Sequence, residues 1–321
     1  MHRSKNMYRY KILLILFLLP FLSRAQGGLT DGTLRVDVNG VGHWVRVAGA
    51  RHGTVPLVVI HGGPGGNHYV FERMAGAELE KFATVIYYEQ RGSGRSDRPG
   101  DGRYTVPLMV SDLEALRKHF GVKQIIPLGY SFGASLALEY TLRHPERVKG
   151  LVLESFATLQ DSSVLLGQMA NFYSQANAAT RPKMDSILRS GGSLADMNMA
   201  FWSIARREDV IRFLFREPEQ GRKVFGMWQE SKIGNTGEVM KALMQERRPV
   251  NLYDDAHRVT APVLILTGVY DRNGALPASI RIKEELPQAE IRFFDRSAHF
   301  PDVEETTGFV AAIRSWLSAL K

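Results

Sequence analysis

A serine at the centre of a Gly-x-Ser-x-Gly segment is the residue of this sequence best suited to chemistry. The segment, Gly129 to Gly133, directly follows an apolar run at 124–128 and precedes a helical pattern at 134–143. So tight a turn between strand and helix forces the serine into strained backbone angles and exposes its hydroxyl at the edge of a sheet, where the next helix begins. The pattern therefore predicts that Ser131 is a nucleophile.

A serine hydroxyl reacts only when a base accepts its proton and an acid orients that base. In this topology the acid and then the histidine follow the serine along the chain, each beyond the carboxyl end of a strand. The apolar run 264–268 leads to Asp271, and the run 292–294 leads to His299, the only one of nine histidines downstream of that acid. We expect Ser131, Asp271 and His299 to form a catalytic triad.

Three other acids compete for the place behind the histidine. Asp295 and Asp302 are close to His299 in sequence, but that does not place them behind the imidazole. Glu154 ends the apolar run after the helix that follows Ser131, and a carboxylate there can also reach a triad histidine. We favour Asp271 because it follows the strand expected to carry the acid.

Acyl transfer also needs hydrogen-bond donors aimed at the developing oxyanion. The segment His-Gly-Gly-Pro-Gly-Gly at 61–66 follows an apolar run at 57–60, and its glycines let the backbone approach a substrate carbonyl. We expect the N–H of Gly63, or alternatively of Gly62, to act with the N–H of Phe132. Two other interpretations compete: a turn that only packs the sheet, and a phosphate-binding loop. A phosphate-binding loop is disfavoured because no Walker lysine or G-x-G-x-x-G is present there.

The elements that must position these residues alternate between strands and helices. Apolar runs at 57–60, 85–88, 124–128, 148–153, 263–267 and 291–294 are typical of strands buried on both faces, and 33–38 and 43–47 alternate around Asn39-Gly40 as a hairpin. Helical patterns cover 106–119 and 305–320. The pattern predicts an α/β fold with a mostly parallel sheet and helices on both faces.

A long stretch at about 156–258 breaks this alternation. It has no convincing strand and is rich in Met, Phe, Trp, Gln and Arg at helical spacing. We expect a helical cap subdomain (a lid) at 156–258, inserted before the penultimate strand of a core domain formed by 26–155 and 259–321. Its Met and aromatic residues are most simply its own core and its contact with the main domain.

The first 25 residues have the layout of a secretory signal peptide. Four basic residues precede an apolar stretch at 12–22, and Ser23 and Ala25 are small residues at −3 and −1 before Gln26. Eleven apolar residues are short for a spanning helix, which needs roughly 20. We expect an exported protein, periplasmic or secreted by a bacterium, with no stable membrane insertion after cleavage. An uncleaved N-terminal anchor is the alternative.

Charge and cysteine content exclude several other classes. Loss of the leader removes five Lys/Arg and no Asp/Glu, so the formal net charge falls from +8 to +3. With no concentrated basic stripe, nucleic-acid binding has little support. The chain has no cysteine, which excludes disulfides, thiolate metal sites and lipidated cysteine anchors. No H-E-x-x-H or comparable ligand cluster occurs, so we expect no metal and no other cofactor.

Three segments together resemble the proline iminopeptidase (prolyl aminopeptidase) branch of the α/β-hydrolase superfamily. They are His-Gly-Gly-Pro-Gly at 61–65, Gln-Arg-Gly-Ser-Gly-Arg-Ser at 90–96 and Gly-Tyr-Ser-Phe-Gly at 129–133, and Ser-Ala-His-Phe-Pro at 297–301 is similar to that family's histidine loop. The resemblance covers roughly 33–155 and 259–321, and the lid matches only loosely. The chain departs from the family at two places. Glu89 stands where the family usually has Asp, and Tyr130 and Phe132 replace its usual Gly-Ser-Trp setting. These changes leave hydrolysis intact but bear on proline specificity.

The resemblance implies removal of an N-terminal residue through an acyl-enzyme, with lid carboxylates binding the substrate's free ammonium. Trp-Gln-Glu at 228–230 is similar to the family's Trp-Glu lid element, which makes Glu230 a candidate anchor; a solvated helix glutamate is the alternative. Glu154 and Tyr130 are further candidates for substrate contact. We thus expect a small peptide or small acyl substrate. The oligomeric state is not indicated.

Two other functions compete with the aminopeptidase. A carboxylesterase or lactonase would use the same triad, whereas a ligand-binding protein would keep the fold with little turnover. Epoxide hydrolases and haloalkane dehalogenases are disfavoured, because they use a carboxylate where this chain has Ser131.

Overall fold

The computed structural model describes residues 29–158, 161–231, 233–246 and 251–320. Its centre is a sheet of eight strands in the order β1-β2-β4-β3-β5-β6-β7-β8. β1 pairs antiparallel with β2 and β2 antiparallel with β4, and every later pairing is parallel. The strands are β1 Gly32–Val38, β2 Val41–Ala48, β3 Leu57–Ile60, β4 Val85–Tyr88, β5 Ile126–Tyr130, β6 Leu151–Glu154, β7 Val263–Gly268 and β8 Glu290–Phe294.

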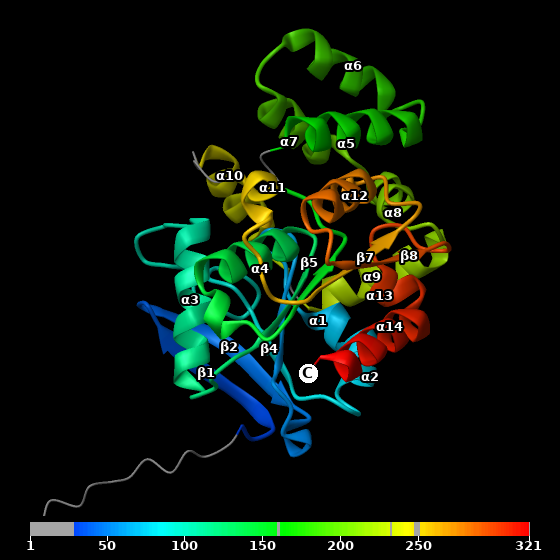
Figure 1. The fold of residues 1–321 in the computed structure, drawn as a ribbon. Helices are drawn as coiled ribbons and strands as arrows, with labels where there is room; N and C mark the ends of the chain where they lie inside the picture. The colour runs from blue at the N-terminus through cyan, green and yellow to red at the C-terminus, as the bar shows by residue number, and fades with distance from the viewer. Residues whose placement is uncertain (1–28, 159–160, 232, 247–250, 321) are drawn as a thin grey trace, which may run out of the picture.

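Helices cover both faces of the sheet, and each face has its own apolar core (Figure 1). On one face lie α3 Val106–His119, α4 Phe132–Arg143, α11 Leu252–Ala256 and α12 Ala275–Glu285. On the other lie α1 Tyr69–Phe71, the π-type turn Glu72–Gly76, α2 Ala77–Leu79 and α14 Thr306–Ala319, with α13 Pro301–Glu304 just before it. Strands β3 to β7 are buried along their length except at Tyr130, the half-buried last residue of β5, as expected for parallel strands between two helical layers.

The helical insertion lies between β6 and β7, at the end of the molecule where β5 and β7 finish (Figure 1). Its helices before α11 are α5 Ser162–Gln175, α6 Arg181–Ser190, α7 Leu194–Ile204, α8 Arg207–Leu214, α9 Pro218–Glu230 and α10 Thr236–Gln245. Helices α5 to α9 enclose a separate apolar cluster, which also takes in Val70 of α1 and Val303 of α13. Val239 and Leu243 of α10 pack instead with the core around α3 and α4.

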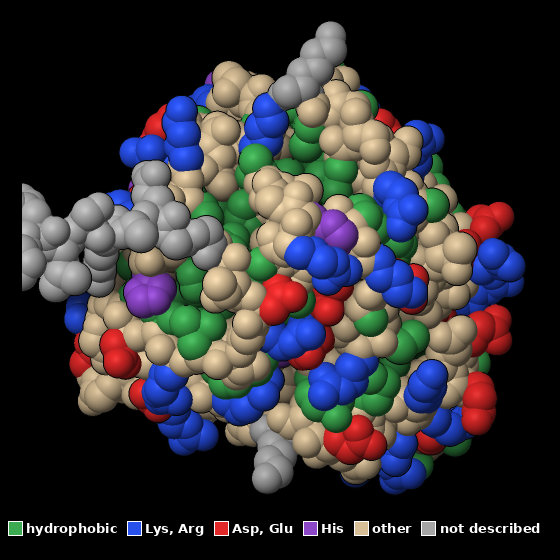
Figure 2. Space-filling view, turned by 90° about the horizontal axis from the view of Figure 1, so that it is seen from below, with side chains coloured by type: hydrophobic (Ala, Val, Ile, Leu, Met, Phe, Trp, Pro, Cys, Tyr) green, Lys and Arg blue, Asp and Glu red, His purple; other side chains and the backbone are tan. Residues whose placement is uncertain are grey.

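The expected fold class is confirmed: a mostly parallel sheet, helices on both faces and a helical lid before the penultimate strand. The predicted signal peptide lies outside the described residues. Within them, no helix is both long enough and apolar enough to cross a membrane. On the face shown in Figure 2, basic and acidic side chains lie interspersed.

Candidate active site

Ser131 occupies a strained turn between β5 and α4. Its backbone angles, φ 55° and ψ −125°, are rarely adopted by residues with a side chain. The two flanking glycines are required by close packing, since a Cβ on Gly129 would collide with the carbonyl oxygen of Gly133, and one on Gly133 with that of Ile60. The turn is held from β6, because the N–H of Ser131 donates to the carbonyl of Glu154 at 2.9 Å. The hydroxyl therefore has a fixed position at the carboxyl edge of the sheet.

His299 connects the serine to Asp271. Its Nε2 lies 3.1 Å from Ser131 Oγ, and its Nδ1 lies 2.8 Å from Asp271 Oδ2. Both the imidazole and the carboxylate are buried, so the contacts form in a site where water competes little. The other oxygen of Asp271 accepts from the N–H of Asn273 at 2.7 Å. The structure thus brings together the three residues expected from the sequence, in the geometry that serine activation requires.

The backbone of the histidine loop is fixed from two sides. The N–H of His299 donates to the carbonyl of Leu214, at the end of α8, at 3.0 Å. Its carbonyl accepts from the hydroxyl of Ser155 at 2.9 Å. Ser155 has a φ of 45° and directly follows β6. Sequence reasoning missed this support; its only signal was a polar residue directly after a buried strand.

The segment 61–66 passes directly beside the nucleophile. A Cβ added to Gly62 would lie 2.9 Å from Ser131 Cβ, so only glycine lets the backbone pass there. Gly63 is exposed, with a φ of 125°. Phe132 is the first residue of α4, and the first N–H groups of a helix have no partner within it. Gly62 therefore lies directly beside the nucleophile, and Gly63 and Phe132 are the next residues along the two segments that meet there.

His61 and Gln90 fix the orientation of the glycine peptides. The N–H of Gln90 donates to His61 Nε2 at 3.0 Å, so the ring proton is on Nδ1 and is donated to the Gly62 carbonyl at 2.9 Å. The Gln90 amide donates to the His61 carbonyl at 2.6 Å. Burial lowers the pKa of His61 to about 4, which keeps the ring neutral. Because both carbonyls are held, the N–H groups of the same peptides point to the opposite side.

Glu154 is not the partner of His299. It is fully buried, and its Oε1 accepts from the N–H of Asp302 at 3.2 Å. Burial raises the pKa of both carboxyl groups, because each would otherwise place a charge in the protein interior; the charge of Asp302 raises the pKa of Glu154 further. The pair lies behind the nucleophile turn and the histidine loop, and the place beside His299 Nδ1 belongs to Asp271. Asp295, the remaining rival, is exposed on the protein surface.

The other two candidates for substrate contact differ in their surroundings. Tyr130 donates from its hydroxyl to the Asn67 carbonyl at 2.7 Å, and its ring stacks on Phe71, so its side chain is engaged in packing. Glu230, at the end of α9, is exposed and accepts from the Tyr69 hydroxyl at 3.0 Å. Residues 67–69 directly follow the glycine segment 61–66, so Glu230 lies beside the loop that borders Ser131.

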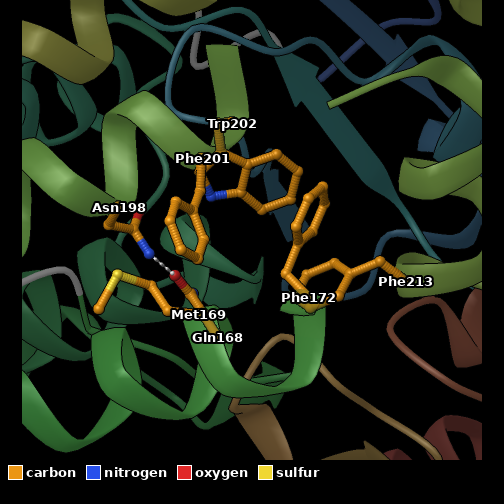
Figure 3. A pocket seen from close by; sticks show the side chains of 7 residues that line it. All are labelled: Gln168, Met169, Phe172, Asn198, Phe201, Trp202 and Phe213. Carbon is orange, nitrogen blue, oxygen red and sulfur yellow. Dashed lines mark hydrogen bonds between the residues drawn. The ribbon is translucent and has the colours of Figure 1, made fainter. Parts of the chain in front are cut away.

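Aromatic side chains fill the interior of the lid close to this site. Figure 3 shows the cluster that we call the lid core: Gln168, Met169, Phe172, Asn198, Phe201, Trp202 and Phe213. The space between these side chains has no room for a water molecule. We therefore interpret it as a packed interior that supports the site, and not as a substrate pocket.

Comparison with known proteins agrees with this architecture. A family model described as alpha/beta hydrolase fold matches residues 55–305. A proline iminopeptidase of Lactiplantibacillus plantarum is 27% identical over 294 residues, which cover 88% of this chain and 98% of the relative.

Solved structures extend the similarity to the whole fold. A proline iminopeptidase-related protein of Thermus thermophilus has a TM-score of 0.72 at 24% identity, and covers 91% of this chain and 99% of its own. An esterase of Rhodococcus has a TM-score of 0.68 at 21% identity, with 91% and 100% covered. At these identities the two structures bear on the fold alone.

Proposed function

The chain belongs to the alpha/beta hydrolase fold family and is a hydrolase, and from this premise we propose that it acts as a serine aminopeptidase of proline iminopeptidase type. It would release N-terminal residues from small peptides through an acyl-enzyme. One observation carries the serine mechanism: Ser131 Oγ, His299 and Asp271 form a continuous chain of contacts of 3.1 and 2.8 Å.

In the first half of the reaction Ser131 Oγ attacks the scissile carbonyl carbon while its proton moves to His299 Nε2. Asp271 accepts the Nδ1–H throughout, which fixes the tautomer and stabilises the charged ring. Collapse of the tetrahedral intermediate breaks the C–N bond, and the proton on Nε2 passes to the leaving amine. In the second half, water attacks the acyl carbonyl carbon and gives a proton to Nε2; collapse then breaks the bond to Ser131 Oγ, which takes that proton back as the acid leaves.

The oxyanion is stabilised by backbone donors. The N–H of Phe132, at the start of α4, and an N–H of the glycine segment, with Gly63 favoured over Gly62, are the proposed pair. Exposure of Gly63 toward solvent and the fixed carbonyls of His61 and Gly62 support this assignment. Loss of one such donor costs roughly 3 kcal/mol of transition-state stabilisation.

Glu230 is the proposed anchor for the substrate's ammonium group. Two observations support this role. Glu230 lies beside Tyr69 and the glycine segment, and this chain is similar to named proline iminopeptidases. An exposed carboxylate beside a tyrosine hydroxyl can bind an ammonium group by charge and by hydrogen bonding.

A carboxylesterase or lactonase is the second candidate, and a specific observation favours it. Several acids of the described lid are already bound to partners within or beside it: Asp209 to Arg212, Glu208 to Arg222, and Asp161 to Arg281. These three acids are therefore not free to form the paired carboxylates of an ammonium site, and an ester needs no such pair.

A substrate panel separates these functions. We expect wild-type protein to cleave aminoacyl anilides faster than short acyl esters, and Ser131→Ala to lose activity on both by a factor on the order of 10⁴ or more. N-acetylation of the anilide should abolish its cleavage, because it removes the ammonium group. If acetylated and free anilides are cleaved equally well, the aminopeptidase is wrong and the esterase stands.

A fluorophosphonate probe provides the test against a non-enzymatic binding protein. The probe should label wild-type protein and fail to label Ser131→Ala. Equal labelling of the two would contradict a nucleophilic Ser131.

We also propose that the protein is exported, on the strength of the leader at 1–25. Intact mass of the protein recovered from the bacterial periplasm or medium should correspond to a chain beginning at Gln26. A protein retained in the cytoplasm with its leader intact would contradict export.

A further inference from the structure

A second hydrogen-bond donor faces the reactive nitrogen of His299. The side-chain amide nitrogen of Asn273, Nδ2, lies 3.3 Å from His299 Nε2, on the nitrogen that also meets Ser131 Oγ at 3.1 Å. With its proton on Nδ1 and donated to Asp271, the neutral ring has a single lone pair on Nε2. The serine hydroxyl and the asparagine amide therefore approach the same acceptor.

The backbone of Asn273 is fixed by hydrogen bonds at both its N–H and its carbonyl. Its N–H donates to Asp271 Oδ1 at 2.7 Å, and its carbonyl accepts from the Gln168 amide of α5 at 3.1 Å. Gln168 in turn accepts from Asn198 of α7 at 2.9 Å, inside the lid core (Figure 3). A chain of amide groups thus leads from the lid to the residue that contacts the base.

We propose that Asn273 is a positioning residue of this site, which donates from Nδ2 to the neutral imidazole of His299 and holds the ring in line with Ser131. The inference rests on the proposed function in so far as the positioned ring is the general base. Its physical content, a hydrogen bond to Nε2, does not depend on any substrate.

The bond discriminates between the two protonation states of the ring. A neutral Nε2 accepts the amide N–H, whereas a protonated Nε2 carries a hydrogen of its own and faces a second donor. A hydrogen bond made only to the neutral form favours that form. Asn273 therefore opposes protonation of the resting base and extends its activity toward lower pH.

The other ionisable groups around the ring act in the opposite direction. Asp271 touches Nδ1 from the loop after β7, the buried Asp302 of α13 lies near the ring, and Glu154 at the end of β6 accepts from the N–H of Asp302. Negative charge on any of them favours a charged ring. The lid adds uncharged groups here: the side-chain amide of Gln168 in α5 donates to the Asn273 carbonyl, and the Leu214 carbonyl at the end of α8 accepts from the N–H of His299.

The test compares substitutions of two asparagines: Asn273 in the loop after Asp271, and Asn171 of α5, which donates to the same loop. Asn273→Leu keeps the side-chain size and removes the donor. Asn171→Leu is the matched control, because Asn171 donates to the neighbouring Arg272 carbonyl at 2.9 Å and holds the loop through a hydrogen bond that does not involve the ring. Asn273→Ala serves as a second variant if the leucine does not fold.

Two measurements report on the ring. The first is the pH titration of the proton on His299 Nδ1, followed by NMR without substrate; the second is the acid limb of the pH profile of kcat/KM. We expect Asn273→Leu or Asn273→Ala to move both midpoints to higher pH, by roughly half to one pH unit. Asn171→Leu should leave them within about 0.2 of wild type.

Three results would overturn the inference: no shift in the Asn273 variants, a shift to lower pH, or an equal rise in Asn171→Leu. A downward shift would mean that Oδ1 faces the ring and stabilises its protonated form. Because the NMR titration needs no turnover, a shifted titration in a protein without hydrolase activity would refute the proposed function and keep the inference. Active enzyme with unshifted midpoints would do the reverse.

Discussion

Buried carboxyl groups illustrate how single residues set the pH dependence of this protein. Glu154 and Asp302 lie together in the interior, and burial raises the pKa of both above the values of the unfolded chain. A group with a raised folded-state pKa binds more protons in the folded protein than in the unfolded one. Its contribution to stability is present in full below the unfolded pKa and is lost as pH rises through the folded pKa.

Replacement of Glu154 by Gln should therefore flatten the pH dependence of stability. In wild type we expect the contribution of this pair to the free energy of unfolding to fall as pH rises from about 4 through the raised pKa values of the folded protein, since the pair must share or lose its protons. In Glu154→Gln that fall should be smaller by on the order of 1–3 kcal/mol. Urea unfolding at a series of pH values measures both curves.

Glu146→Gln is the control for this comparison, because Glu146 is an exposed acid in a surface ion pair. It should follow the wild-type curve within about 0.5 kcal/mol. Parallel curves for wild type and Glu154→Gln would show that the buried pair does not carry the predicted pH dependence.

At the scale of elements, buried ion pairs hold the strands and loops that carry the site. Arg91 follows β4 and directly succeeds Gln90, which fixes the glycine segment. Its guanidinium donates to both oxygens of Asp112 in α3, at 2.7 and 2.8 Å, and both side chains are buried. The pair therefore ties the loop after β4 to a helix on the face of the sheet.

Arg91→Met should destabilise the fold strongly. The substitution leaves the Asp112 carboxylate buried without its cation, which costs about 3–5 kcal/mol. Arg98→Met is the matched control, since Arg98 is exposed and its pair with Glu238 is 3.7 Å long; it should cost less than about 1 kcal/mol. The midpoint of urea denaturation measures both. Equal losses would contradict a special role for the buried pair.

Elements with strong periodicity were predictable from sequence, and their ends were not. The helix at 106–119 and the strands at 57–60 and 85–88 have the expected bounds. The strand expected at 124–128 instead runs from Ile126 to Tyr130, because it must pair with Glu154 up to the nucleophile. The helix expected at 305–320 is preceded by the short α13, and at Glu305 the backbone leaves helical angles, with φ −133°.

The site residues whose place depends on chain order could be predicted from the sequence. Those whose contacts depend on the lid could not. Ser131, Asp271 and His299 could be selected because each follows a strand in a fixed order. Asn273 carries no such signal, since its side-chain contact with His299 depends on a loop whose backbone is held from α5. Non-local amide contacts of this kind have no periodicity that a sequence could reveal.

At the scale of the whole molecule, the lid contacts three segments that border the site: the loop after Asp271, the glycine segment 61–66 and the loop after β4. From α5, Gln168 and Asn171 donate to carbonyls of the loop after Asp271. At the start of α10, the hydroxyl of Thr236 donates to the Gly65 carbonyl at 3.1 Å, on the glycine segment. Asn235 donates to the Gly92 carbonyl at 2.7 Å, on the loop after β4. The position of the lid and the geometry of the site are therefore linked mechanically.

Thr236→Val tests this link on the oxyanion side. Valine keeps the shape of threonine and removes the donor, so the Gly65 carbonyl loses a hydrogen bond of about 0.5–1.5 kcal/mol. A less firmly held glycine segment stabilises the oxyanion less well, so we expect kcat to fall roughly 2- to 10-fold with little change in KM. Ser203→Ala, an exposed hydroxyl within α7 of the lid, should leave both constants unchanged. If Thr236→Val lowers the melting temperature and leaves kcat at the wild-type value, the contact stabilises the fold alone and the lid does not position the oxyanion site.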